Sequence, residues 1–127
     1  MYRVELAGKL IGETRLEVAD PPMGVVGGLI EWRISDNPYQ LLKKHCEEYG
    51  ATINDLDPNL EFIDTQTIDE LRVFRLDGKE IEGIAGGVFS GFAEDGYHVT
   101  ILGVPYPFYD EEFPHHREAY ENKFKEL

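Results

Sequence analysis

Histidine and cysteine side chains are the groups of this chain that could bind a metal ion or activate a nucleophile near neutral pH. The 127 residues include His45, His98, His115, His116 and a single cysteine, Cys46. A structural zinc site takes four Cys or His ligands, and adjacent helical side chains such as His45 and Cys46 point about 100° apart. Cys46 also falls on the apolar face of a predicted helix, which favours a buried, unreactive thiol. We therefore expect no metal site, no cofactor and no catalytic residue among these groups.

Carboxylates are abundant throughout the chain. The sequence has 25 Asp and Glu against 12 Lys and Arg, which gives a formal net charge of −13. With so many acids, neighbouring pairs arise by chance, and no pair stands in the apolar context that separates two pKa values for acid–base catalysis. The charge excludes nucleic acid and anionic membranes as favoured partners and would attract a cationic protein.

The segment 102–120, LGVPYPFYDEEFPHHREAY, combines aromatic, acidic and imidazole side chains with three prolines. Aromatic residues beside prolines form rigid contact surface of the kind found in recognition patches. Alternatively, the aromatics pin an irregular connection and the last helix onto the sheet. Met23, on a loop, also has two interpretations: it is a contact residue for a partner, or its side chain fills a gap at the edge of the core. The candidate binding residues are Tyr106, Tyr109, Asp110, Glu111, Glu112, Phe113, His115 and His116.

Two phrases, RLEVADPPMGVVGG and ILGVPYPFYDEEFPHHREAYENKF, resemble a group of small, acidic bacterial proteins known mainly as hypothetical proteins. The shared tail is of the type GxPYPxYxExFPHHxxxY, which in this sequence runs from Gly103 to Tyr120. The resemblance implies a bacterial, intracellular, single-domain protein. It implies no activity and no catalytic residue.

The chain reads as one domain, residues 1–127, because no linker or low-complexity run divides it. Alternating apolar residues predict short strands, and Asp77-Gly78 predicts a tight hairpin turn. The clearest helix covers about 37–49, with Ser35 or Asp36 as its N-cap. Pro114 could open a short C-terminal helix that presents Tyr120, Phe124 and Leu127 inward. We expect an α+β fold in which a curved, mainly antiparallel sheet of about six or seven strands carries these two helices.

A glycine-punctuated apolar phrase occurs twice, as GVVGGLIEW at 24–32 and GIAGGVFSGF at 83–92. One explanation is an ancient duplication that gives two similar hairpins. The other is that bent strands of a small sheet use glycine where the backbone curves or approaches a neighbour closely. Neither phrase is a phosphate-binding loop, because no GxGxxG or GxxxxGK[ST] pattern is present.

The sequence favours a soluble cytoplasmic protein. No apolar run approaches the roughly 20 residues that cross a bilayer, the start lacks the pattern of a secretion signal, and a lone cysteine suits a reducing compartment. The leading hypothesis is a non-enzymatic bacterial binding or regulatory protein, immunity-like in character, that presents an acidic aromatic surface to a cationic protein. Two alternatives stay open: a small-ligand-binding domain or hydrolase-type enzyme that uses His115 or His116, and a structural subunit of a homo-oligomer.

Overall fold

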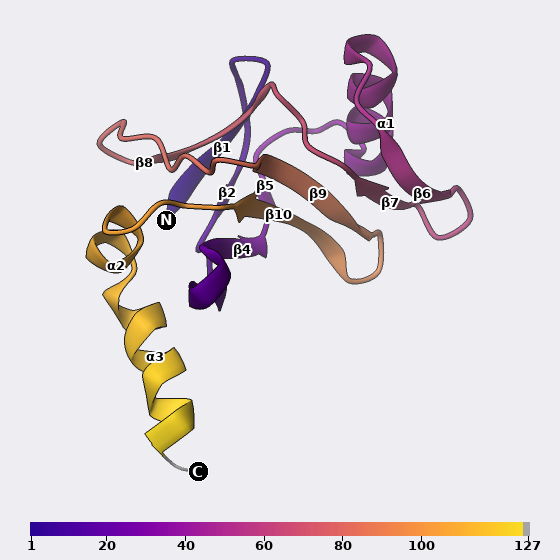
Figure 1. The fold of residues 1–127 in the computed structure, drawn as a ribbon. Coiled ribbons are helices and arrows are strands. Elements are labelled where there is room, and N and C mark those ends of the chain that lie inside the picture. The colour runs from indigo at the N-terminus through magenta and orange to yellow at the C-terminus, as the bar shows by residue number, and fades with distance from the viewer. Residues whose placement is uncertain (126–127) are drawn as a thin grey trace.

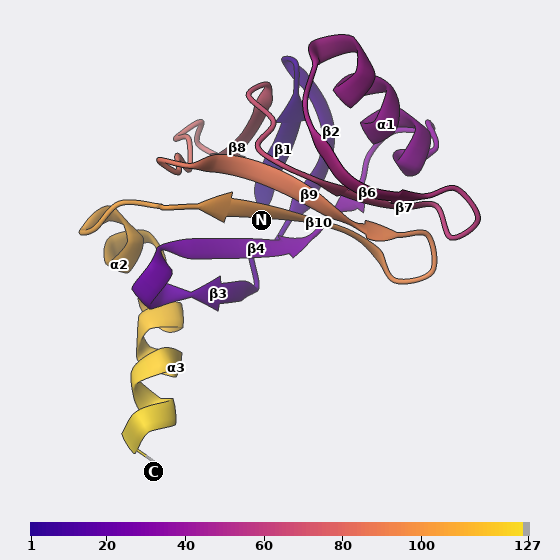
Figure 2. The ribbon, with the colours of Figure 1, turned by 45° about the vertical axis from the view of Figure 1, so that its right-hand side comes forward.

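Two antiparallel sheets and three α-helices make up the fold in the computed structural model, which describes residues 1–125 (Figure 1). The smaller sheet has the order β5-β2-β1-β8, formed by β5 (Glu31–Trp32), β2 (Lys9–Thr14), β1 (Tyr2–Leu6) and β8 (Leu71–Arg75). The larger sheet has the order β3-β4-β10-β9-β7-β6, and Figure 2 labels all six of its strands. Its strands are β3 (Val18–Asp20), β4 (Val25–Leu29), β10 (Gly96–Leu102), β9 (Gly86–Phe92), β7 (Phe62–Thr65) and β6 (Ile53–Asp57).

The predicted α+β class and antiparallel pairing are confirmed. The strands within residues 1–125 number ten rather than six or seven, and they divide between two sheets. Part of the difference lies in β3 and β5, which are 3 and 2 residues long and too short to show an alternating pattern.

One apolar core joins both sheets and the first helix. Val4 of the smaller sheet, Phe89 and Val99 of the larger sheet and Leu42 of α1 (Pro38–Tyr49) are fully buried and belong to one cluster. Because a single cluster contains residues of every layer, the chain forms a single domain.

The N-cap of helix α1 lies one residue after Asp36, the later of its two predicted positions. The side chain of Asn37, not that of Ser35 or Asp36, accepts a hydrogen bond of 2.9 Å from the backbone N–H of Gln40. Pro38 occupies the first helical position, which makes the residue before it the N-cap. The predicted burial of Cys46 is confirmed, since its side chain is 1% exposed.

The Asp77-Gly78 turn forms but does not lead into a long hairpin. Gly78 has φ 96° and its N–H donates to the carbonyl of Arg75 at 2.9 Å. On the return, an isolated bridge between Phe74 and Glu80 adds to the smaller sheet, and the chain then enters the larger sheet as β9. The segment 79–85 therefore lies between the two sheets.

The two similar glycine phrases flank the same strand. β4 and β9 pair with β10 from its two sides, both antiparallel and without a shift of register. A Cβ on Gly24 would lie 2.7 Å from the carbonyl oxygen of Val104, and one on Gly83 would collide with the carbonyl oxygen of Leu102. Glycine at both places therefore permits close backbone approach to the end of β10 rather than a bulge.

Two helices follow β10: α2 (Phe108–Glu112) and α3 (Pro114–Lys125). α3 extends away from the sheets (Figures 1 and 2) and has no buried side chain among its residues. The prediction that Phe124 faces inward is wrong, because Phe124 is 56% exposed. Tyr120 is half-buried, and its ring packs on that of Phe124 at a centroid distance of 4.9 Å. The third residue of that prediction, Leu127, lies outside the described residues.

Candidate functional site

Two of the predicted surface aromatics lie in the core. Tyr109 and Phe113 are 2% and 1% exposed, with their rings 5.4 Å apart. The Tyr109 hydroxyl donates a hydrogen bond of 2.9 Å to the carbonyl of Val25, which fixes α2 against β4. Residues four positions apart share one side of a helical turn, so both rings face the sheet and neither is open to a partner. Tyr106, by contrast, is 76% exposed.

The predicted acidic run 110–112 does not form one anionic face. Asp110 accepts a hydrogen bond of 2.9 Å from Arg117 on α3. Glu111 is exposed, whereas the side chain of Glu112 is 14% exposed and turned toward the smaller sheet. Because internal cations already neutralise two of the three acids, this run is a weaker contact for a basic partner than the sequence predicted.

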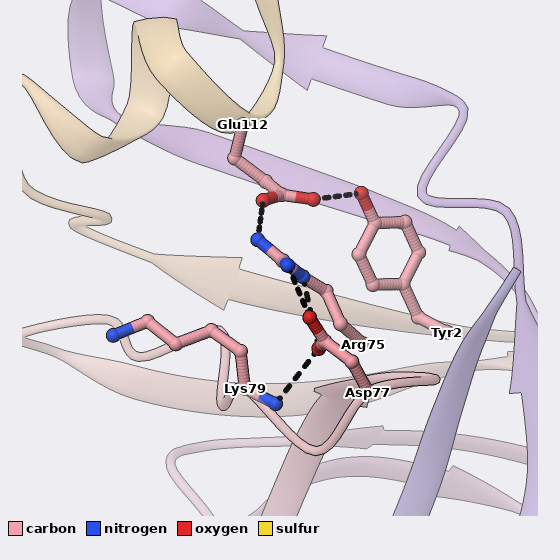
Figure 3. A network of polar contacts seen from close by, with 5 residues as sticks. All are labelled: Tyr2, Arg75, Asp77, Lys79 and Glu112. Carbon is pink, nitrogen blue, oxygen red and sulfur yellow. Dashed lines mark hydrogen bonds and ion pairs between the residues drawn. The ribbon is translucent and has the colours of Figure 1, made fainter.

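Glu112 belongs to a polar network that ties α2 to the smaller sheet (Figure 3). Its carboxylate accepts hydrogen bonds from the Tyr2 hydroxyl at 2.8 Å and from Arg75 at 3.0 Å. Arg75 also pairs with Asp77, which accepts from the backbone N–H of Lys79 at 3.2 Å. Burial and Glu112 raise the pKa of Tyr2, and the hydrogen bond from Arg75 lowers the pKa of Asp77. The network therefore holds the chain that follows β10 in place.

The adjacent histidines have different surroundings. His116 Nε2 lies 2.7 Å from the carbonyl oxygen of Leu16, and because a carbonyl only accepts, that nitrogen carries the proton. His115 is exposed, and partial burial together with the His116 ring lowers its pKa. His116 thus attaches α3 to the loop before β3. Neither imidazole lines the hollows described below.

Three exposed apolar side chains surround an open hollow of about 400 Å³ at the end of β10. They are Met23, Ile84 and Tyr106, with exposed fractions of 68%, 87% and 76%. We call this feature the apolar hollow. Large apolar side chains gathered around one concavity, rather than scattered singly, are typical of interaction sites.

Backbone hydrogen bonds position the apolar hollow. Gly24, with φ 66°, ends the short 3-10 helix η1 (Pro21–Met23) and donates to the carbonyl of Pro21 at 3.0 Å. Its own carbonyl accepts from Val104 N–H at 2.8 Å, and Ile84 N–H donates to Gly103 at 2.9 Å. Three segments far apart in sequence are thereby held together at the end of β10.

A second hollow adjoins the apolar hollow, and a third adjoins the second. The nearer one, of about 180 Å³, shares Pro105 with it and is lined by Lys79, Glu80, Glu82, Pro105 and Phe108. The farther one, of about 280 Å³, shares Glu80 and Glu82 with the nearer one and lies between the edges of β8 and β9. The nearer hollow therefore shares lining residues with both of the others, and Glu80 and Glu82 line two of the three hollows.

The repulsion between Glu80 and Glu82 is only partly relieved by a neighbouring cation. Burial and the neighbouring Glu82 carboxyl raise the pKa of Glu80, although Arg72 opposes this shift from 3.5 Å. The other cation of this region, Lys79, lies over the ring of Phe108 at 5.5 Å from its centroid. Glu80 thus has Arg72 as a close cation, and a further positive charge beside Glu82 would reduce the repulsion between the two carboxylates.

A buried histidine–carboxylate pair has no signal in the sequence. His45 Nε2 lies 2.8 Å from Glu70 Oε1, and the imidazole is 6% exposed and stacked on Tyr49 with a centroid distance of 4.3 Å. The pair joins α1 to the residue before β8. Because 25 positions separate its members, no local spacing could have revealed it.

Among residues 1–125 no three His, Cys, Asp or Glu side chains converge as metal ligands, and no helix there is long and apolar enough to cross a membrane. No protein-family model matches the chain, and neither a curated protein nor a solved structure is found to be similar. The bacterial resemblance of the tail stays a prediction.

Proposed function

We propose that this protein is a non-enzymatic binding protein that accepts a cationic protein partner on the apolar hollow and its acidic neighbours. The observation that carries the proposal is the gathering of Met23, Ile84 and Tyr106, each more than two-thirds exposed, around one concavity. Covering such side chains releases free energy at about 25 cal/mol per Å² of apolar surface. This surface replaces the run 110–112 as the expected contact.

The charge of the chain supports a positively charged partner. A net charge of −13 steers a basic protein toward this molecule and repels an acidic one. The tail resemblance and the single cysteine favour a bacterial cytoplasmic setting, in which an immunity-like or regulatory role fits a small binding domain. A second copy of this chain is disfavoured as the occupant, because two molecules of the same large negative charge repel each other.

Site-specific photo-crosslinking in the source cells tests this function. A photoreactive amino acid is placed at Tyr106 and, as a matched control, at Leu60, which is 56% exposed in another part of the surface. We expect a basic protein to be crosslinked from position 106 and not from position 60. The crosslink should disappear when Met23→Ser and Ile84→Ser are added, and these exposed substitutions should change stability by no more than about 0.5 kcal/mol.

Three results would contradict the proposal. Crosslinks of equal yield from positions 106 and 60 would show that the apolar hollow is not a specific contact. An acidic partner would remove the electrostatic part of the reasoning. A crosslinked second copy of this chain would establish the homo-oligomer alternative instead.

A further inference from the structure

The nearer hollow already holds one ammonium group of the chain. Lys79 Nζ lies over the Phe108 ring at 5.5 Å from its centroid, and both side chains line this hollow of about 180 Å³. The face of an aromatic ring carries partial negative charge, so it attracts a cation placed within about 6 Å of the centroid. Lys79 is exposed, whereas Phe108 is half-buried and packs against the core. The ring is therefore a fixed part of the hollow, and the lysine is a surface side chain that can leave it.

Two carboxylates belong to the lining of the same hollow. They are those of Glu80 and Glu82. Arg72 Nε lies 3.5 Å from the Glu80 carboxylate, but no Lys or Arg within residues 1–125 forms an ion pair with Glu82. An added ammonium group in this hollow would gain the ring face and reduce the repulsion between the two carboxylates.

Hydrogen bonds hold both walls of the nearer hollow in place. Ile81 N–H donates to the carbonyl of Val73 at 2.8 Å, which fixes the chain next to Glu80 along β8. Phe108 is the first residue of α2, and the hydrogen bonds described above attach this helix to β4 and to the smaller sheet. A ligand that enters a hollow with fixed walls loses little free energy to ordering the protein.

On the basis of the function proposed above, we propose that the nearer hollow is an ammonium site into which the cationic partner inserts one lysine side chain. The incoming ammonium group takes the place of Lys79 over the Phe108 ring and pairs with the Glu82 carboxylate. Lys79 is released into solvent. The methylene groups of the incoming lysine lie against Pro105 and Phe108.

Two small model compounds titrated into isotope-labelled protein test this inference by NMR. The first is Nα-acetyl-lysine methylamide. The second is Nα-acetyl-norleucine methylamide, whose apolar side chain ends in a methyl group and carries no charge. Resonances of the Phe108 ring and of the Lys79 and Glu82 side chains report directly on occupancy of the hollow.

We expect the lysine compound to shift these resonances saturably at millimolar concentration. The norleucine compound should bind about fivefold more weakly, because it lacks the cation–aromatic contact and the ion pair with Glu82. This difference should shrink at high salt, since salt screens an exposed ion pair.

Two protein variants with matched controls isolate the contacts. Lys79→Met removes the internal ammonium group and should strengthen binding of the lysine compound about threefold, whereas Lys9→Met, at an exposed position of β2 outside this hollow, should leave it nearly unchanged. Glu82→Gln should weaken binding of the lysine compound about threefold. Glu94→Gln, in the exposed β9–β10 turn, makes the same change in net charge and should have little effect.

The outcomes separate this inference from the proposed function. Equal effects of either variant and its control would show that only overall charge matters and would overturn the ammonium site. Equal affinity of the norleucine compound, or no saturable shift of the named resonances with the lysine compound, would also overturn it. The crosslinking experiment then decides the proposed function by itself, because Tyr106 lines the apolar hollow and not the nearer hollow.

Discussion

Replacement of Tyr39 by Phe should stabilise this protein. The Tyr39 side chain is 2% exposed, and its hydroxyl has no hydrogen-bond partner among the described residues. A buried hydroxyl without a partner costs about 1–3 kcal/mol, because it loses its hydrogen bonds to water and gains none in return. Tyr39→Phe removes that oxygen and leaves the ring in place. We expect the free energy of unfolding to rise by about 1 kcal/mol.

Tyr109 supplies the matched control. It is buried to the same 2% exposed fraction, but its hydroxyl donates a hydrogen bond of 2.9 Å to Val25. Tyr109→Phe removes the same atom from a comparable environment and leaves that carbonyl without its donor. We expect a loss of about 1 kcal/mol, the usual net contribution of one hydrogen bond.

Urea unfolding followed by the fluorescence of Trp32 measures both changes. The dependence on urea should be the same for the three proteins, so that shifts in midpoint report stability alone. A difference of 1 kcal/mol corresponds to about 4 °C in melting temperature for a domain of this size. The reasoning is refuted if Tyr39→Phe destabilises the protein as much as Tyr109→Phe does, since the Tyr39 hydroxyl would then be making a favourable contact.

Three further predictions concern the thiol, one glycine and alkaline pH. Cys46 is 1% exposed and burial raises its pKa, so a thiol reagent should modify the native protein far more slowly than the urea-unfolded chain; equal rates would contradict its burial. Gly83→Ala should cost about 1–3 kcal/mol in urea unfolding because the new methyl group meets the carbonyl of Leu102, and an unchanged midpoint would exclude that close approach. Burial raises the pKa of Tyr97 and of Tyr109 from 10.0 to about 12. Because these values lie above those of the unfolded chain, their contribution to stability is complete below pH 10 and is lost as pH rises toward 12, which tyrosinate absorbance and circular dichroism would follow together.

The candidate site could be predicted from the sequence only in part. Met23 was recognised as a possible contact because it stands on a proline-stiffened loop, and Tyr106 because it lies among prolines and aromatics. Ile84 was missed, since between glycines it reads as one more apolar residue of a strand. Tyr109 and Phe113 are buried, as in the alternative interpretation in which the aromatics of this segment pin an irregular connection onto the sheet.

Features that depend on neighbouring residues could be predicted before the fold was known. The spacing of Tyr39, Leu42, Cys46 and Tyr49 predicts one apolar face of α1, and Gly50 marks the helix end. The first three of these side chains are buried, whereas Tyr49 is 53% exposed. Alternation and turn residues fixed the antiparallel character of the fold. These signals are local because helix and strand periods, caps and tight turns involve residues only a few positions apart.

The tertiary structure alone decided which distant groups meet. Tyr2 and Glu112 are 110 positions apart, and His116 and Leu16 are 100 apart, yet each pair forms a hydrogen bond. The same long-range packing paired Glu112 with Arg75 and brought Met23, Ile84 and Tyr106 around one hollow. Such contacts are set by how the sheets pack on a shared core, which depends on the whole chain at once and leaves no mark in local spacing.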